Sequence, residues 1–160
     1  MTTENLFSTI TSYMDEAERH YEADVEDGVI SLDMQGDDGE WSIYISVIDD
    51  DEIRRVLIHS YLSVRIPEIN RLKVAEQIAR FNYDMSMGNF GLSMDDGNVF
   101  FKTAVDLADG QITPIMFERM YGLNACVMND HYAQILSVGF GGEVQVKAPA
   151  EAIPEGSLLQ

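Results

Sequence analysis

The sequence is most informative between Pro67 and Leu107, where it has the residues PEINRLKVAEQIARFNYDMSMGNFGLSMDDGNVFFKTAVDL. Proline suits the first turn of a helix, because its missing N–H would have no partner there in any case. A stripe of one helix face follows, with a 3.6-residue period that Gly88 interrupts: Leu72, Ala75, Ile78, Ala79 and Asn82. Two alternating segments then flank the turn Asp95–Asn98 and predict a β-hairpin: Phe90, Leu92 and Met94, then Val99, Phe101, Thr103 and Val105.

Three further strands are predicted ahead of this helix, over residues 30–34, 41–48 and 53–64. Apolar and polar residues alternate in them, and turns rich in aspartate separate them, so the strands should be antiparallel neighbours. A first helix is predicted before the strands, with Thr2 and Thr3 as N-caps and an end near His20. Its apolar stripe is Leu6, Ile10, Tyr13, Met14, Ala17 and Tyr21.

A long last helix is predicted from Thr113, the expected N-cap, to about Val138, where Gly139, Gly141 and Gly142 stop it. Its apolar set is wider than one core-facing stripe, so a second subunit or a partner would have to cover the other side. This set is Met116, Phe117, Met120, Tyr121, Leu123, Val127, Met128, Tyr132, Ile135 and Leu136.

Helix, three strands, helix, two strands and helix together predict a single α+β domain over residues 1–142. The sheet should be antiparallel, with about five strands and with helices packed against it. Residues 143–160 contain Pro149, Pro154 and Gly156 without a sustained period, and we expect them to form a mobile C-terminal tail.

The composition limits the classes of partner. The chain of 160 residues is 46% hydrophobic and has a net charge of −18, so nucleic acid and anionic membrane surfaces should repel it. The sequence shows no secretory signal and no apolar run long enough to span a bilayer. Cys126 is the one cysteine, which excludes an internal disulfide and fits a reducing cytoplasm. These features predict a cytoplasmic protein.

Several positions resemble the YbjN family of bacterial proteins, over roughly Glu16 to Gly142. They are Pro67, Asn82, Gly88-x-Phe90, Asp96-Gly97-x-Val99-x-Phe101 and Thr113, followed by Tyr132, Leu136 and Val138. The resemblance implies a fold similar to type III secretion chaperones, which are small, acidic, usually homodimeric and non-enzymatic. Those chaperones bind an extended segment of a partner across apolar patches and sheet edges. The family pattern contains no catalytic residue to carry over.

Few residues have the spacing expected of a metal-binding or catalytic site. The acidic runs Asp37–Gly39, Asp49–Glu52 and Asp95–Gly97 could hold Ca²⁺ or Mg²⁺, but their positions favour simple turns. The three histidines lack a second ligand at zinc spacing. Cys126 and His131 point in different directions on one helix, so we expect Cys126 to be a small buried apolar residue. No metal, no cofactor and no catalytic residue are predicted.

The residues are consistent with two candidate functions. The first is a non-enzymatic, chaperone-like or regulatory interaction module, expected to be a homodimer, that binds apolar segments of a partner polypeptide with help from sheet-edge pairing. Its expected contact residues are Leu92, Met94, Phe101, Met116, Met120 and Met128. The alternative is a small-molecule sensor or enzyme with a pocket between the sheet and the last helix. That pocket would be lined by Tyr44, His59, Tyr61 and Tyr132.

Overall fold

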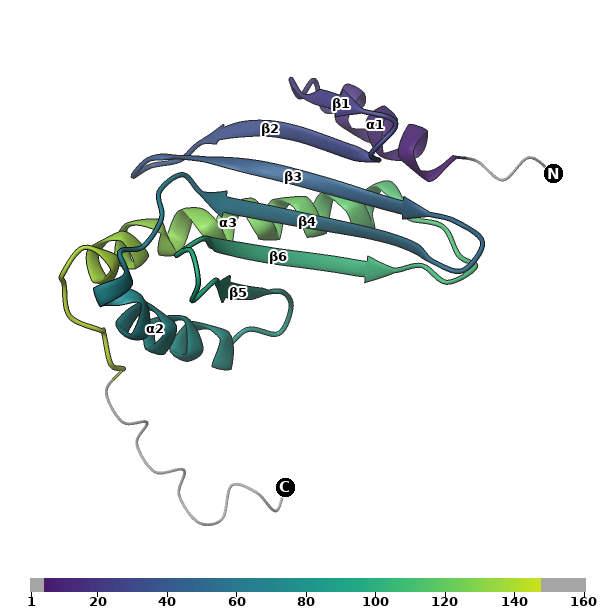
Figure 1. The fold of residues 1–160 in the computed structure, drawn as a ribbon. Helices are drawn as coiled ribbons and strands as arrows, with labels where there is room; N and C mark the ends of the chain where they lie inside the picture. The colour runs from purple at the N-terminus through teal and green to yellow at the C-terminus, as the bar shows by residue number, and fades with distance from the viewer. Residues whose placement is uncertain (1–4, 148–160) are drawn as a thin grey trace, which may run out of the picture.

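One antiparallel sheet organises the chain in the computed structural model, which describes residues 5–147. The six strands lie in the order β1-β2-β3-β4-β6-β5 (Figure 1). Their bounds are Glu22–Asp24 (β1), Val29–Gln35 (β2), Glu40–Asp49 (β3), Arg54–Leu62 (β4), Asn89–Leu92 (β5) and Val99–Asp106 (β6). The helices are α1 (Leu6–Glu16), α2 (Arg71–Tyr83) and α3 (Pro114–Gly139), with a short 3-10 helix, η1 (Glu68–Asn70), ahead of α2.

All three helices pack on the same side of the sheet. Figure 1 shows α3 running behind β4 and β6, and these two strands are its main contacts in the sheet. The N-terminal helix α1 packs against β3 and α3, while α2 packs against β5 and α3. The other face of the sheet has no helix across it in the described part of the chain. The predicted α+β architecture with helices against an antiparallel sheet is confirmed.

The alternation in the strand segments predicted which side chains face the helices. In β4, the side chains of Val56, Ile58, Ser60 and Leu62 are buried and the residues between them are half-buried. In β3, the apolar residues Trp41, Ile43 and Ile45 are buried in the same way. The sequence prediction missed β1, because its three residues are all exposed and show no alternation.

The first helix begins and ends at different residues from those predicted. Asn5 is its N-cap, and the side-chain oxygen accepts hydrogen bonds from the N–H groups of Phe7 (2.9 Å) and Ser8 (3.3 Å). The predicted caps, Thr2 and Thr3, lie outside the described residues. The helix ends at Glu16, so Tyr21 belongs to the connection to β1 and not to the helix.

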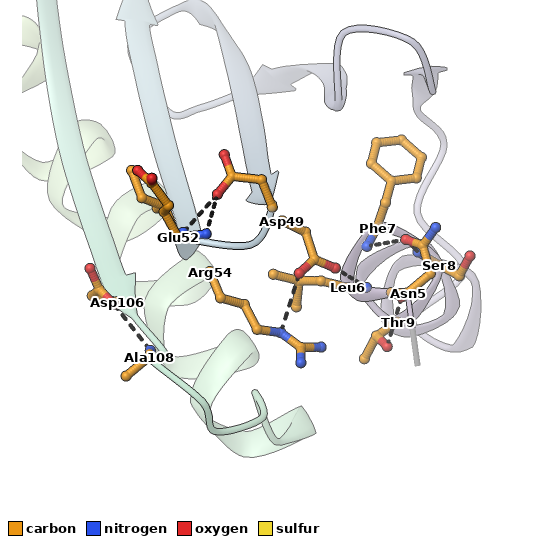
Figure 2. A network of polar contacts seen from close by, with 12 residues as sticks. Asn5, Leu6, Phe7, Ser8, Thr9, Asp49, Glu52, Arg54, Asp106 and Ala108 are labelled. Carbon is orange, nitrogen blue, oxygen red and sulfur yellow. Dashed lines mark hydrogen bonds and ion pairs between the residues drawn. The ribbon is translucent and has the colours of Figure 1, made fainter. Parts of the chain in front are cut away.

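A carboxylate at the end of β3 anchors this helix to the sheet. The Oδ2 atom of Asp49 accepts a hydrogen bond from the N–H of Leu6 at 3.0 Å, and its Oδ1 atom lies 3.6 Å from Nε of Arg54 (Figure 2). A carboxylate at a helix N-terminus satisfies an otherwise unpaired N–H and interacts favourably with the helix dipole. The start of α1 is therefore fixed to the β3–β4 turn.

In α2, the predicted apolar stripe is partly wrong. Leu72 is 77% exposed and Ala79 is also exposed, whereas Val74, Gln77 and Ile78 are buried. The helix contains two apolar stripes, and the sequence period alone does not show which one packs inward. Packing against α3 and β5 selects the stripe that contains Val74 and Ile78. The other stripe stays at the surface.

The last helix agrees closely with its prediction. The Thr113 side chain accepts a hydrogen bond from the N–H of Met116 at 3.2 Å, and Pro114 is the first helical residue. The helix ends at Gly139; Gly141 has a φ of +109°, and the N–H of Gly142 donates to the carbonyl of Ser137 at 2.7 Å. The sheet, α1 and α2 together cover most of its wide apolar surface.

After α3 the chain turns back along α2. The side chain of Val144 packs against the core, the N–H of Gln145 donates to the buried Gln77 side chain at 2.8 Å, and Lys147 forms an ion pair with Asp84. Residues 148–160 of the predicted tail lie outside the described residues.

Candidate functional site

Four rings gather on the side of the sheet that no described helix covers. Tyr44 comes from β3, His59 and Tyr61 from β4, and Phe100 from β6, and strand pairing places them next to one another. The ring centroids of His59 and Phe100 are 5.3 Å apart, those of His59 and Tyr61 are 5.5 Å apart, and those of Tyr44 and Tyr61 are 5.7 Å apart. We call these four residues the aromatic patch.

A glycine in β5 gives the patch one of its edges. A Cβ atom on Gly91 would lie 2.3 Å from Cζ of Phe100, so the Phe100 ring lies directly over the backbone of Gly91. The Nζ atom of Lys102 lies 5.9 Å from the centroid of the same ring, within the range of a cation–π contact. The patch therefore has a cation at its β5–β6 side.

Burial keeps the patch uncharged near neutral pH. Desolvation, with a smaller contribution from the Lys102 charge, lowers the pKa of the His59 imidazole below its usual 6.5. Desolvation likewise raises the pKa of the Tyr61 hydroxyl above 10.0. Both groups are therefore neutral at pH 7. The patch is an aromatic surface with two uncharged polar groups, the His59 imidazole and the Tyr61 hydroxyl.

A hollow opens next to the patch at its β2 side. It encloses about 420 Å³, and Tyr44 belongs both to this hollow and to the aromatic patch. Two carboxylates, from Glu22 and Asp33, lie in its wall. The complete lining is His20, Tyr21, Glu22, Ser31, Leu32, Asp33, Ser42 and Tyr44. We call it the acidic hollow.

A second surface lies on the helical side, between α2 and α3. An open groove of about 1110 Å³ runs between these helices, and residues 145–147 form one of its borders. Its wall is mainly apolar, with Ala79, Phe81, Met85 and Val127 among its residues. We call it the α2–α3 groove. It is the larger of the two hollows described here.

The outward side of α2 and η1 adds to this apolar surface. Tyr83, Ile69 and Leu72 have the largest exposed fractions of the large apolar side chains described, at 89%, 88% and 77%. Their spacing places them on one side of the helix. Exposed apolar residues scattered singly are ordinary in proteins, whereas several on one helix side indicate a contact surface.

The structure separates the six predicted contact residues into two groups. Phe101, Met120 and Met128 are buried in the core of this single chain. Leu92 is half-buried, while Met94 and Met116 are exposed, in the β5–β6 loop and at the start of α3 respectively. A partner could reach only the second group without opening the core. The role of these residues in binding stays a prediction.

The alternative pocket between the sheet and the last helix is filled. Asn124 of α3 is fully buried there and donates to the carbonyl of Ile58 (2.8 Å) and to the hydroxyl of Thr103 (3.1 Å). Its side-chain oxygen accepts a hydrogen bond from Ser60 at 2.6 Å, and the Ser60 hydroxyl in turn accepts one from the Trp41 indole at 3.1 Å. This hydrogen-bonded network and the apolar side chains around it fill the interface between the sheet and α3.

The four predicted pocket residues also do not meet. Tyr44, His59 and Tyr61 lie together, but on the uncovered face of the sheet. Tyr132 lies on the helical side, where its ring packs against Trp41 and its hydroxyl donates to the carbonyl of Glu40 at 3.1 Å. Three of the residues therefore contribute to a surface, and the fourth belongs to the core.

The acidic turns have structural hydrogen bonds. Asp50 accepts from the N–H groups of Glu52 (2.9 Å) and Ile53 (2.7 Å). Hydrogen bonds from Ser93 and the N–H of Asn98, together with the Arg65 guanidinium, lower the pKa of Asp96 to about 2. Within residues 5–147 no group of three or more metal-ligating side chains is arranged to hold a metal ion.

His131 packs between the rings of Phe81 and Phe90, at centroid distances of 4.3 and 5.4 Å. Its Nδ1 atom lies 2.8 Å from the Val127 carbonyl, which can only accept, so Nδ1 carries the proton. The prediction that Cys126 is buried is wrong: the residue is exposed, because its side of α3 faces away from the sheet.

One edge of the sheet is closed to strand pairing at its centre. The Asn82 side chain, from α2, accepts a hydrogen bond from the N–H of Phe90 at 2.7 Å and donates one to its carbonyl at 3.0 Å. These two bonds occupy the backbone groups that an added strand would use at this residue of β5. Any sheet-edge pairing by a partner must therefore avoid Phe90.

The comparisons with known proteins agree with this architecture. The family model YbjN, described as "Putative bacterial sensory transduction regulator", matches residues 7–136. The chain belongs to the YbjN family. The predicted resemblance is thereby confirmed. No curated protein sequence matches the chain, and within residues 5–147 no helix is long and apolar enough to cross a bilayer.

Two solved structures have the same fold. The crystal structure of YbjN from E. coli matches with a TM-score of 0.60 and 13% identity, covering 80% of this chain and 92% of that one. A chain of the ExsC–ExsE complex matches with a TM-score of 0.56 and 15% identity, covering 82% of this chain and 96% of that one. At these identities the likeness concerns the fold, and it agrees with the predicted type III secretion chaperone-like architecture.

Proposed function

We propose that this YbjN-family protein is a non-enzymatic interaction module that binds an apolar segment of a partner polypeptide in the α2–α3 groove. The observation that carries the proposal is the groove itself, an open and mainly apolar channel of about 1110 Å³ between two helices. Burying apolar surface contributes roughly 25 cal/mol per Å², so a segment with a few aliphatic side chains would gain binding energy there. The groove presents the ring of Phe81 and the flexible side chain of Met85, which adapts to varied apolar shapes.

The family supports a role in binding. The family description is that of a regulator, and one structure of the same fold is a complex of two named components, ExsC and ExsE. By analogy, we propose that a partner polypeptide occupies the α2–α3 groove of this chain. Cys126 and His131 have separate surroundings, since Cys126 is exposed whereas His131 packs against Phe81 and Phe90. Binding, in the cytoplasm, is therefore the activity that we propose.

A homodimer would use the outward side of α2. Ile69, Leu72 and Tyr83 form a stripe beside the groove, and two copies could pack these stripes together about a two-fold axis. The Glu76–Arg80 ion pair, at 2.7 Å, lies on the same side of the helix and would stay at the rim. Glu76, Arg80 and Tyr83 also line the groove, so the dimer is tested at Leu72, which does not line it.

The test of the groove uses Ala79→Glu, which places a carboxylate on an exposed groove residue without removing a core side chain. The matched control is Ala133→Glu, at an exposed alanine of α3 away from the groove. A polypeptide recovered with the wild-type protein should bind Ala79→Glu at least about ten-fold more weakly by calorimetry, because a buried unpaired charge is costly. Ala133→Glu should bind as the wild type does. Equal affinity of all three proteins would refute the groove as the site.

A separate variant tests the proposed dimer. Leu72→Glu should convert the dimer to a monomer in light scattering while the affinity for the polypeptide stays within about two-fold. A wild-type protein that is already monomeric at high concentration would contradict the dimer and leave the groove result unaffected.

A further inference from the structure

The uncovered face of the sheet has no part in the groove or in the proposed dimer. It joins two features of different chemistry, since the acidic hollow and the aromatic patch share Tyr44. From the hollow, the surface continues across His59 and Tyr61 to Phe100, where Lys102 borders it. One end of the surface is therefore anionic, the middle is aromatic, and the far end has a single cation.

The charges of the chain show what kind of partner fits the anionic end. Seven of the ten lysines and arginines form ion pairs with carboxylates of the chain itself. Within the described residues Glu22 and Asp33 form no ion pair, although both line the hollow. With a net charge of −18, the protein repels nucleic acid, and a second copy would bring its own carboxylates against the hollow. A cationic partner is the electrostatic complement.

We propose that the uncovered face binds a cationic segment of a polypeptide, with an arginine or lysine side chain in the acidic hollow and neighbouring apolar side chains on the aromatic patch. This site is separate from the α2–α3 groove and does not depend on it. Aromatic rings on a flat sheet present a large apolar area that is already ordered, because each ring contacts the next. Little side-chain freedom would be lost when a partner covers them.

The chain already makes this type of contact within itself. The Arg19 guanidinium lies 4.0 Å from the ring centroid of Tyr121, and its two terminal nitrogens donate to the carboxylate of Glu118 at 2.7 Å each. A tyrosine beside a carboxylate therefore holds a guanidinium on the helical side of the sheet. The hollow places Tyr44 and Tyr21 beside Asp33 and Glu22, the same two kinds of group, and no cation within residues 5–147 forms an ion pair with either carboxylate.

The polarity of the surface also fixes a direction. Lys102 lies at the end opposite the hollow, so the cationic side chain of the partner is held at β2 and its apolar side chains extend toward β6. A segment with the reverse order of charge would meet Lys102 with its own cation. Alternation along an extended segment would direct every second side chain onto the sheet face.

The experiment measures binding of a synthetic peptide in which one arginine and two leucines alternate with serines, so that all three face one side of the extended chain. Binding is followed by fluorescence anisotropy at physiological salt, where exposed charges are largely screened. The test variant is the double charge reversal Glu22→Lys with Asp33→Lys, at two exposed positions. The matched control, Asp109→Lys with Asp130→Lys, changes the net charge equally at exposed positions on the β6–α3 loop and on α3. Denaturation midpoints and circular dichroism verify that every variant is folded.

We expect Glu22→Lys with Asp33→Lys to weaken binding of the peptide at least about ten-fold, and the control pair to change it less than about three-fold. Tyr44→Ser should also weaken binding, and the same peptide with glutamate in place of arginine should not bind. Ala79→Glu, the groove variant, should bind the arginine–leucine peptide as the wild type does. In NMR spectra the peptide should shift the resonances of the Tyr44, His59 and Tyr61 rings.

Three results would overturn this site. Equal weakening by the two double variants would mean that only the overall charge matters. Unchanged binding by Tyr44→Ser and by Glu22→Lys with Asp33→Lys would place the peptide elsewhere. Loss of binding in Ala79→Glu alone would assign the peptide to the α2–α3 groove, which would support the proposed function and refute the second surface.

Discussion

The two faces of one sheet differ in what their side chains contact, although the same strands supply both. On β4, Ser60 is fully buried and hydrogen-bonded to Asn124, while the next residue, Tyr61, lies in the aromatic patch on the opposite side. Between the strands and α3 the helical side is filled and the Asn124 side chain is hydrogen-bonded, so the residues there are constrained by packing. The uncovered side contacts only itself within the described residues, so its residues are available to a partner. On β4, therefore, the residues that stabilise the fold and the residues of the proposed second binding surface lie on opposite sides of the same strand.

The largest effect should come from removing the centre of the buried network. Asn124→Ala leaves the hydroxyls of Ser60 and Thr103 and the carbonyl of Ile58 without their partner in the core. We expect a loss of about 3 kcal/mol in the free energy of unfolding, measured by urea denaturation.

The control on the uncovered face is Tyr44→Ser, which should change the free energy of unfolding by only about 0.5 kcal/mol. A loss in Tyr44→Ser as large as that in Asn124→Ala would contradict the division of roles between the two faces.

A smaller effect is expected where α2 closes the edge of the sheet. Asn82→Ala removes both hydrogen bonds to the backbone of Phe90, so we expect a loss of about 1–2 kcal/mol and faster hydrogen exchange at the Phe90 amide. Asn89→Ala is the matched change, because the Asn89 side chain donates only one bond to the same carbonyl. If the Phe90 amide stays protected in Asn82→Ala, the side chain does not close this edge.

The smallest effect concerns the charge of the uncovered face. Because the pKa of folded His59 lies below the usual 6.5, the unfolded chain binds more protons as the pH falls through 6.5, and the folded state loses stability. The contribution is fully present above pH 6.5 and is lost on acidification, when the imidazolium must form beside Lys102 and Tyr61.

His59→Gln should therefore show a weaker decrease in denaturation midpoint than the wild type between pH 7 and about pH 5. An NMR titration of the His59 ring supplies a direct check. A ring that titrates at or above 6.5 in the folded protein would show that the patch does not favour the neutral form.

Much of the fold follows from local patterns in the sequence. Alternation identified which residues of β3 and β4 face the core, and the Thr113-Pro114 pair identified the start of α3. In α2, however, two apolar stripes compete, and the contacts that select Val74 over Leu72 come from α3 and β5, distant in sequence. Strand β1 has no apolar alternation, so only its pairing with Val29–Ser31 reveals it.

The candidate sites were harder to predict. Strand alternation places His59 and Tyr61 opposite Val56 and Ile58, which face the core, and so already argues against a pocket that His59 and Tyr61 share with the last helix. The predicted pocket joins these aromatic residues by residue type alone, and the strand pairing puts three of them on the uncovered face. Residue type alone predicts all four methionines as contact residues. In the structure Met120 and Met128 are buried, whereas Met94 and Met116 are exposed. The acidic hollow depends on β1 lying beside β2, a pairing that the missed strand concealed.

The return of the chain along α2 determines where the protein can be fused to another molecule. Lys147 is held to Asp84 and borders the α2–α3 groove, so a tag or fluorescent domain joined after it starts at the mouth of that channel. Asn5 caps α1 near the β3–β4 turn, at the other end of the sheet (Figure 1). Immobilisation through the amino-terminal side therefore leaves the groove accessible, whereas a domain fused directly to Lys147 would compete with whatever enters it.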